Sequence, residues 1–170
     1  MKLGIITACV LSLGLLSANT YAEMDMSNTS MTTSPQLAAK HKAEGEAFLK
    51  VNQKKPGVVT LPDGLQYIVV EEGKGARPSP EDSVTVHYAG TLINGKEFDS
   101  SYKRGEPATF PVSAVIPGWV EALQLMKEGS TWELFIPASL AYGEQGAPPL
   151  IGPNEMLIFK VNLIKVNKKS

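Results

Sequence analysis

Cysteine is nearly absent from the 170-residue sequence, and the single copy, Cys9, lies in a segment expected to be removed. This segment begins with Lys2, continues as an apolar run and ends in small residues at Ala22, as secretory signal peptides do. A retained membrane anchor is the alternative, but the run is short and ends in polar residues. Removing residues 1–22 from 170 leaves 148 residues without cysteine, which excludes disulfides and thiol chemistry. The sequence predicts a protein of the periplasm, or one that is secreted or displayed at the cell surface.

Histidine is also scarce, since only His41 and His87 occur. His87 alternates with Tyr88 in a strand-like run, which predicts a solvated histidine and not a base or a metal ligand. The sequence has no nucleophile elbow, no phosphate-binding loop and no HExxH motif. These absences argue against a hydrolase or a metalloenzyme, and we expect no metal and no cofactor.

Neither sign of charge dominates. There are 16 Lys and Arg against 17 Asp and Glu, and loss of Lys2 with the signal segment would change the net charge from −1 to −2. A chain this close to neutral has no bulk attraction for nucleic acid or for an anionic membrane surface. Past the N-terminal run, no apolar stretch approaches the roughly 20 residues that span a bilayer. We expect no nucleic-acid partner and no stable membrane insertion after signal cleavage.

The remaining chain divides into a tail, one helix and a β-rich domain. Residues 23–34 are polar and lack periodicity, which predicts a disordered tail. Residues 35–55 predict a helix over 36–52 and a linker, with Ser34 as the N-cap. Gly45 inside this helix costs about 1 kcal/mol relative to alanine, so the helix needs a surface to pack on. Residues 56–167 form the predicted domain.

Short β-type runs separated by turn residues fill this domain. They cover residues 58–61, 65–72, 83–93, 96–98, 109–112, 130–137 and 155–166. Asn94 and Gly95 form the strongest two-residue hairpin signal, between two of these runs. In the longer runs apolar residues alternate with polar ones, which predicts strands with one apolar face.

A short, nearly all-apolar segment at residues 117–126 lies among the strands. Pro117 suits the first helical position, and only Glu121 and Gln124 form a polar stripe. Such a helix must be surrounded, and antiparallel strands with one apolar face need a cover. The sequence therefore predicts an α+β fold. In it, a twisted antiparallel half-barrel sheet of about five strands wraps around one short helix, with an N-terminal helical extension.

Several aromatic residues occupy positions where a core could use aliphatic side chains. Trp119 begins the short helix, Phe98 directly follows the hairpin, and Tyr142 lies in a loop. Together with Tyr88 they are candidates for a binding pocket, because binding residues gather at element ends and in loops. The aromatic residues expected only to fill the core are Phe110, Trp132 and Phe135.

Four separated motifs resemble the FKBP-type peptidyl-prolyl isomerases. They are VHYAGTLINGKEFDSS at residues 86–101, VIPGW at 115–119, AYG at 141–143 and LIFKVNL at 157–163. The match runs in the family's order from about residue 56 to residue 166. IGPNE at 151–155 and the signal segment are similar to the bacterial branch, the macrophage infectivity potentiator (Mip) proteins and their periplasmic relatives. The family's half-barrel sheet around one short helix agrees with the fold expected above.

The resemblance implies a peptidyl-prolyl cis-trans isomerase that accelerates rotation about X–Pro bonds in exported proteins without covalent chemistry. Trp119 would form the floor of an aromatic pocket, beneath the prolyl ring. The residues that the resemblance places in the walls are Tyr88, Phe98, Val115, Ile116, Ile151 and Phe159. The backbone N–H of Ile116 would hold a ligand carbonyl.

The resemblance also implies the catalytic roles. Trp119, Phe98 and Phe159 would grip the ring, while Asp99 and Tyr142 would contact the moving amide. A further residue, Arg104, would pair with Asp99. No cofactor or metal is implied, because the barrier to rotation is mostly lost amide resonance.

The implied partners are unfolded or folding polypeptides that contain X–Pro bonds, with macrolides such as tacrolimus or rapamycin as inhibitors. Two departures from the best-known eukaryotic members are expected to open the pocket rim. Ala108 stands in place of an aromatic residue, and Ala147 in place of a histidine. Both changes therefore bear on substrate preference and on macrolide affinity.

Two other functions compete with catalysis. The first is a proline-binding periplasmic chaperone with incidental or no isomerase activity, in which residues 36–52 could bind unfolded chains. Full Mip-type proteins have a much longer N-terminal region with a dimerisation module, so dimerisation is not carried over to this chain. The second is an inert structural domain, in which the candidate aromatic residues only pack.

Overall fold

The computed structural model describes residues 34–169 of the chain. The predicted signal peptide at 1–22 lies outside the described residues, as does the predicted tail at 23–34 apart from Ser34. Among the described residues, no helix combines the length and the apolar character needed to cross a bilayer.

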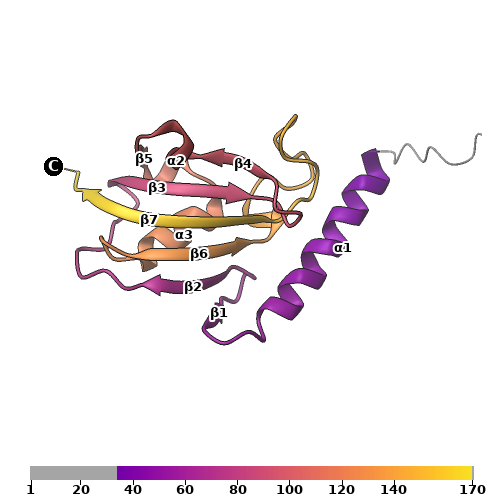
Figure 1. The fold of residues 1–170 in the computed structure, drawn as a ribbon, viewed down its shortest axis with the longest axis horizontal. Coiled ribbons are helices and arrows are strands. Elements are labelled where there is room, and N and C mark those ends of the chain that lie inside the picture. Colours follow the sequence, from indigo (N-terminus) through magenta and orange to yellow (C-terminus); the bar gives the residue numbers. More distant parts are fainter. Residues whose placement is uncertain (1–33, 170) are drawn as a thin grey trace, which may run out of the picture. The chain divides into compact units, whose positions relative to one another are not determined.

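A single antiparallel sheet forms the body of the described chain (Figure 1). Its strands are β1 (Val58–Thr60), β2 (Gln66–Glu71), β3 (Ser83–Thr91), β4 (Glu97–Ser100), β5 (Ala108–Pro111), β6 (Thr131–Ile136) and β7 (Leu157–Asn167). The spatial order is β1-β2-β6-β7-β3-β4, and β5 also pairs with β3. The predicted α+β class is confirmed.

The sheet has seven strands, where the sequence predicted about five. The difference arises mainly at one edge of β3, which two short strands share. β5 pairs with residues 83–86 and β4 with residues 89–91, while β7 runs along the opposite edge. Helix α2, Ser101–Arg104, fills the interval between β4 and β5. Arg104 is the last residue of this short helix.

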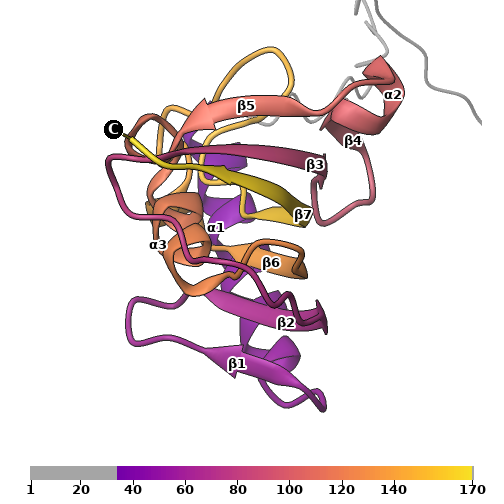
Figure 2. The same ribbon diagram turned by 90° about the vertical axis from the view of Figure 1, so that its left-hand side faces the viewer.

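Helix α3, Pro117–Leu125, is the core helix that the sequence predicted, and it begins at Pro117 as expected. It lies against one face of the sheet (Figure 2) and buries Trp119, Ala122 and Leu123 there. The alternating residues of β3, β6 and β7 supply the facing surface, as the predicted periodicity required. Burying one leucine-sized side chain stabilises the fold by about 1.5–3 kcal/mol, so each buried residue of this enclosure adds a contribution of that size.

Helix α1, Ser34–Asn52, contains the helix predicted over 36–52. One stripe of α1, spaced four, three and four residues apart, contacts the rest of the described chain. The members of this stripe are His41, Gly45, Phe48 and Asn52. The Phe48 ring lies 5.9 Å from the Phe135 ring, and Asn52 donates from Nδ2 to Gln66 Oε1 over 3.0 Å. The surface that this helix needs is therefore the outside of the sheet, at β2 and β6.

The end of β7 is tied to the segment before β3 by one buried carboxylate, Asp82. Its oxygens accept hydrogen bonds from Lys168 Nζ (2.7 Å), from the Ser79 N–H (2.7 Å) and from the Lys169 N–H (3.0 Å). The Lys168 ammonium, followed by the backbone donors, holds the pKa of Asp82 well below its ordinary value. Folding therefore favours the ionised form of this group.

We expect Asp82→Asn to lower the free energy of unfolding at pH 7. Because the pKa is lowered in the folded state, the contribution is present above the ordinary carboxyl pKa of about 4 and is lost as the pH falls below it. Urea unfolding at pH 7, 5 and 3 should show that the difference in free energy of unfolding between wild type and Asp82→Asn becomes smaller at low pH. The neighbouring exposed carboxylate provides a control, Glu81→Gln, which should leave the free energy of unfolding at pH 7 unchanged. A difference in free energy of unfolding that does not change with pH would contradict this account.

Candidate functional site

Trp119 sits at the start of α3 with three aromatic rings around it. The indole meets Tyr88 at a centroid distance of 5.3 Å and 89°, and Phe159 at 5.3 Å and 82°. Phe110, from β5, is 6.2 Å away at 89°. Edge-to-face packing of this kind adds about 0.5–1.5 kcal/mol per pair beyond area burial, so the indole is held firmly, with 4% of its surface exposed.

A cavity of about 430 Å³ opens beside this indole. Its lining is mostly apolar and comes from β3, β4, β5, α3, β7 and two loops. The lining residues are Tyr88, Phe98, Asp99, Phe110, Ala114, Val115, Ile116, Trp119, Tyr142 and Phe159. A mostly apolar hollow of this volume with a few polar groups is the usual form of a small-ligand site.

A β-bulge aims two consecutive residues of β4 into the cavity. Gly90 pairs with Asp99 and Thr91 pairs with Glu97, so Phe98 is the extra residue on β4. Consecutive strand residues normally point to opposite faces, but at a bulge the local twist changes. Phe98 and Asp99 consequently both line the cavity.

Gly90 leaves the space in which the rings of Phe98 and Phe159 meet. The two rings pack edge to face across β3 at 5.4 Å and 87°. A Cβ atom on Gly90 would lie 2.6 Å from Phe159 Cε1 and 2.6 Å from Phe98 Cζ, well inside van der Waals contact. The strand therefore needs glycine here for the cavity wall to close.

A charged network stands at the cavity rim. The Tyr88 hydroxyl donates to Asp99 Oδ2 over 2.5 Å, and Arg104 donates both to Asp99 Oδ1 and, over 2.8 Å, to the Tyr88 oxygen. Burial alone would raise the pKa of Asp99, but the hydrogen bonds from Tyr88 and Arg104 outweigh it and hold that pKa below its ordinary value. Burial and the Asp99 hydrogen bond raise the pKa of Tyr88. Asp99 is therefore a fixed carboxylate and Tyr88 a neutral phenol at neutral pH.

Two groups at the rim are free to bind a ligand. Among the described residues, no acceptor receives the backbone N–H of Ile116, which precedes α3. The Tyr142 side chain reaches the cavity from a loop and is 43% exposed, and its hydroxyl has no partner in the described part of the chain. One amide donor and one hydroxyl on residues that line the cavity thus have no partner among the described residues.

The structure brings together eight of the ten residues that the resemblance implied for the site. Arg104 does not line the cavity but pairs with Asp99, as expected. Ile151 is buried and packs in the core without reaching the cavity lining. Ala108 and Ala147, the departures expected at the rim, are partly buried against the core and also do not line the cavity.

Sequence reasoning missed Ala114 and placed Phe110 only in the core, whereas both line the cavity. The alternation of residues along β5 could have predicted that Phe110 faces inward. Ala108 and Phe110 share one face of that strand, and Phe110 pairs with the buried Val84. Because β5 lies at the sheet edge near α3, that inward face meets the hollow beside the helix as well as the core.

We expect Gly90→Ala to cost about 1–3 kcal/mol in stability, because the added methyl group overpacks the junction of Phe98 and Phe159. Urea unfolding and near-ultraviolet circular dichroism would measure the loss and the disturbed rings. The matched control is Gly45→Ala, whose Cβ would meet Met156 Cβ at 3.4 Å. This change should be neutral or should stabilise α1 by up to about 1 kcal/mol. Equal effects of the two substitutions would contradict the role given to Gly90.

Comparison with known proteins identifies the family of the chain. The family model for FKBP-type peptidyl-prolyl cis-trans isomerase matches residues 74–164, and the model for the domain amino terminal to it matches residues 16–69. The crystal structure of FkpA from Escherichia coli superposes with a TM-score of 0.77 and 48% identity, over 79% of this chain and 62% of that one.

Two relatives are similar in sequence across most of the chain. The outer membrane protein MIP of Legionella longbeachae is 60% identical over 131 residues, which are 77% of this chain and 56% of that protein. The peptidyl-prolyl cis-trans isomerase Mip of Coxiella burnetii is 63% identical over 126 residues, which are 74% of this chain and 55% of that protein. The chain thus spans little more than half the length of these relatives. It belongs to the FKBP-type peptidyl-prolyl cis-trans isomerase family, close to Mip and FkpA.

Proposed function

We propose that the protein is a peptidyl-prolyl cis-trans isomerase that accelerates rotation about X–Pro bonds in exported polypeptides. The observation that carries the proposal is the aromatic cavity closed by Trp119, with Asp99, Tyr142 and the Ile116 N–H at its rim. Membership of the family supports the same reaction. The cavity has the size and polarity for a prolyl ring and its preceding amide.

This reaction can be catalysed without a nucleophile. Rotation about an X–Pro bond faces a barrier of about 20 kcal/mol, because the planar amide is stabilised by resonance. The planar amide is more polar than the twisted one, so water stabilises the ground state more than the transition state. An apolar cavity reverses that preference, and each 1.4 kcal/mol of differential binding accelerates the reaction about tenfold.

One group of side chains binds the prolyl ring, and another contacts the rotating amide. Trp119, Phe98 and Phe159 hold the prolyl ring, and the Ile116 N–H binds a carbonyl of the substrate. Asp99 and Tyr142 contact the amide as it turns. Since Arg104 and the Tyr88 hydroxyl already satisfy Asp99, its carboxylate acts as a fixed wall of the site.

We further propose that the substrates are unfolded or folding chains in the periplasm or at the cell surface, and that macrolides such as tacrolimus or rapamycin compete for the cavity. The N-terminal signal pattern supports export. The name of one relative, outer membrane protein MIP, is consistent with that location.

A proline-binding chaperone is the second candidate. The observation that favours it is a second cavity, of about 490 Å³, between α1 and the β3–β4 turn. Phe48 and Ile93 line this cavity together with charged residues of α1, so an extended chain could be held away from the prolyl site. Suppressed aggregation of a proline-free client, without any isomerase turnover, would favour this function.

We expect catalytic amounts of the protein to accelerate cis-trans exchange of a Leu-Pro or Phe-Pro peptide, measured by NMR exchange spectroscopy, and we expect rapamycin to suppress the acceleration. Asp99→Ala and Trp119→Ala should each lower kcat/KM about tenfold or more, a loss of about 1.4 kcal/mol or more of transition-state stabilisation. Both variants disturb the cavity beside the amide.

The matched control is Trp132→Ala, since Trp132 is as buried as Trp119 but stacks on Tyr67 away from the cavity. Among variants that circular dichroism shows to be folded, it should keep near-wild-type turnover. Unchanged turnover in Asp99→Ala, or equal losses in the two tryptophan variants, would contradict the proposed site. No acceleration by a folded protein that still binds the peptide would favour the chaperone.

A further inference from the structure

His41 of α1 contacts a turn that lies far along the chain, at residues 152–155. Its Nδ1 is 2.9 Å from the Pro153 carbonyl oxygen, and because a carbonyl only accepts, Nδ1 is the donor. Its Nε2 is 3.6 Å from Glu155 Oε1. Both side chains are only 15% exposed, so the contact is largely shielded from water.

The turn is shaped to receive this imidazole. A Cβ atom on Gly152 would lie 2.9 Å from His41 Cε1, so the ring occupies the space that a side chain would need. The Gly152 N–H donates to Glu155 Oε2 over 2.8 Å, which holds the carboxylate toward the imidazole. Asn154 adds a longer hydrogen bond, 3.4 Å, from Nδ2 to the Ala38 carbonyl on α1. The turn is therefore fastened to α1 at three of its four residues.

The same turn supports the loop that carries Tyr142. The Asn154 N–H donates to the carbonyl of Gly143, the residue after Tyr142, over 2.8 Å. A Cβ atom on Gly146 would lie 2.4 Å from the Gly152 oxygen, so the two backbones are in direct contact there. The Gly146 N–H in turn donates to the Tyr142 carbonyl over 3.2 Å.

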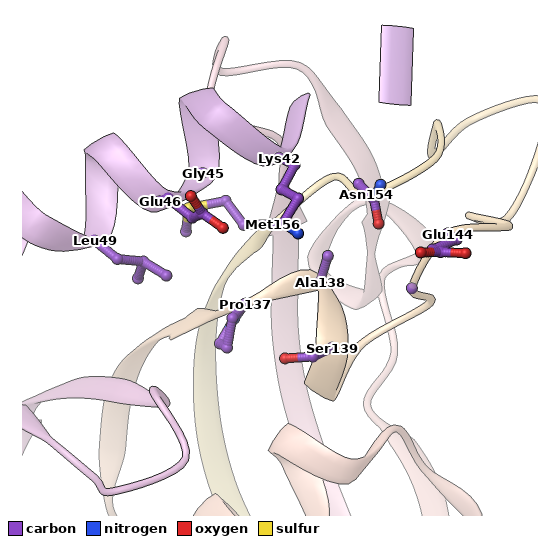
Figure 3. A pocket seen from close by; sticks show the side chains of 11 residues that line it. Lys42, Gly45, Glu46, Leu49, Pro137, Ala138, Ser139, Glu144, Asn154 and Met156 are labelled. Atoms are coloured by element: carbon purple, nitrogen blue, oxygen red, sulfur yellow. The ribbon is translucent and has the colours of Figure 1, made fainter. Parts of the chain in front are cut away.

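Elsewhere α1 and this loop are separated by a cavity of about 280 Å³ (Figure 3). Lys42 and Glu46 of α1 line one side of it, and Ser139 and Glu144 line the other. Because this hollow lies between them, α1 supports the loop mainly through the turn at 152–155. His41 is the α1 side chain that makes that connection.

We propose that His41 is a positioning residue for the isomerase site. Through the turn at 152–155 it holds the loop so that Tyr142 faces the aromatic cavity. The Tyr142 side chain is 43% exposed and makes no hydrogen bond within the described chain, so its place depends on the backbone of its loop. A small displacement of a group beside the reacting amide lowers the rate without changing the chemistry. This inference rests on the function proposed above.

The test measures kcat/KM of the full chain by peptide exchange NMR. His41→Ala should lower kcat/KM about three- to tenfold, the effect of losing one hydrogen bond. His41→Asn should recover much of the activity, because its amide can donate to the Pro153 carbonyl from the place of Nδ1. The control on the same helix is Glu44→Gln. Within the described residues Glu44 pairs with the exposed Lys40, and this variant should match wild type.

A double-mutant cycle separates positioning from stability. In a Tyr142→Ala background, His41→Ala should not lower kcat/KM any further. In an Asp99→Ala background, the fold-losses in kcat/KM of the two substitutions should multiply. Two results would overturn the inference. The first is a His41→Ala variant that unfolds at a lower temperature but keeps the wild-type kcat/KM. The second is a double variant with Tyr142→Ala in which the two single-variant losses in kcat/KM multiply.

The Tyr142 ring resonances give a readout independent of turnover. His41→Ala should shift or broaden them relative to Glu44→Gln, and unchanged resonances would overturn the inference. If the wild-type chain accelerates no exchange, the proposed function fails, and these resonances alone then decide whether His41 positions Tyr142.

Discussion

The enclosure of one short apolar helix governs the rest of this structure. Helix α3 carries so few polar residues that it is stable only when the sheet covers it, and the buried apolar residues of β3, β6 and β7 provide that cover. Trp119 lies at the helix start, where the enclosure is incomplete, and edge-on rings from three strands hold it there. The cavity is thus an opening at the edge of the core, and its floor, Trp119, is itself a buried core residue.

The walls of the cavity rely on local exceptions to regular structure. The bulge at Phe98 aims two neighbours inward, Gly90 makes room for them, and the break between β4 and β5 provides helix α2, which carries Arg104. The remaining wall is Tyr142 on a loop, and that loop is tied through a turn to α1. The N-terminal helix is therefore coupled to a site to which it contributes no residue.

The fold class, the core helix and most of the strands could be predicted from periodicity and turn residues. Eight of the ten implied site residues also line the cavity. The bulge could not be predicted, because a period of two places Phe98 and Asp99 on opposite faces. The stripe of α1 that contacts the rest of the described chain could not be predicted either. It consists of a histidine, a glycine, a phenylalanine and an asparagine, and it has no apolar periodicity. Phe110 was assigned to the core because alternation cannot show where a core opens.

The most direct test of the central claim is where a prolyl ring binds. Intermolecular NOEs between a short X–Pro peptide and the protein, with the peptide ring protons assigned in both isomers, would locate it. The account predicts NOEs from the prolyl ring to the Trp119 indole and the Phe159 ring. Accelerated exchange accompanied by NOEs only to α1, with none to Trp119, would contradict it.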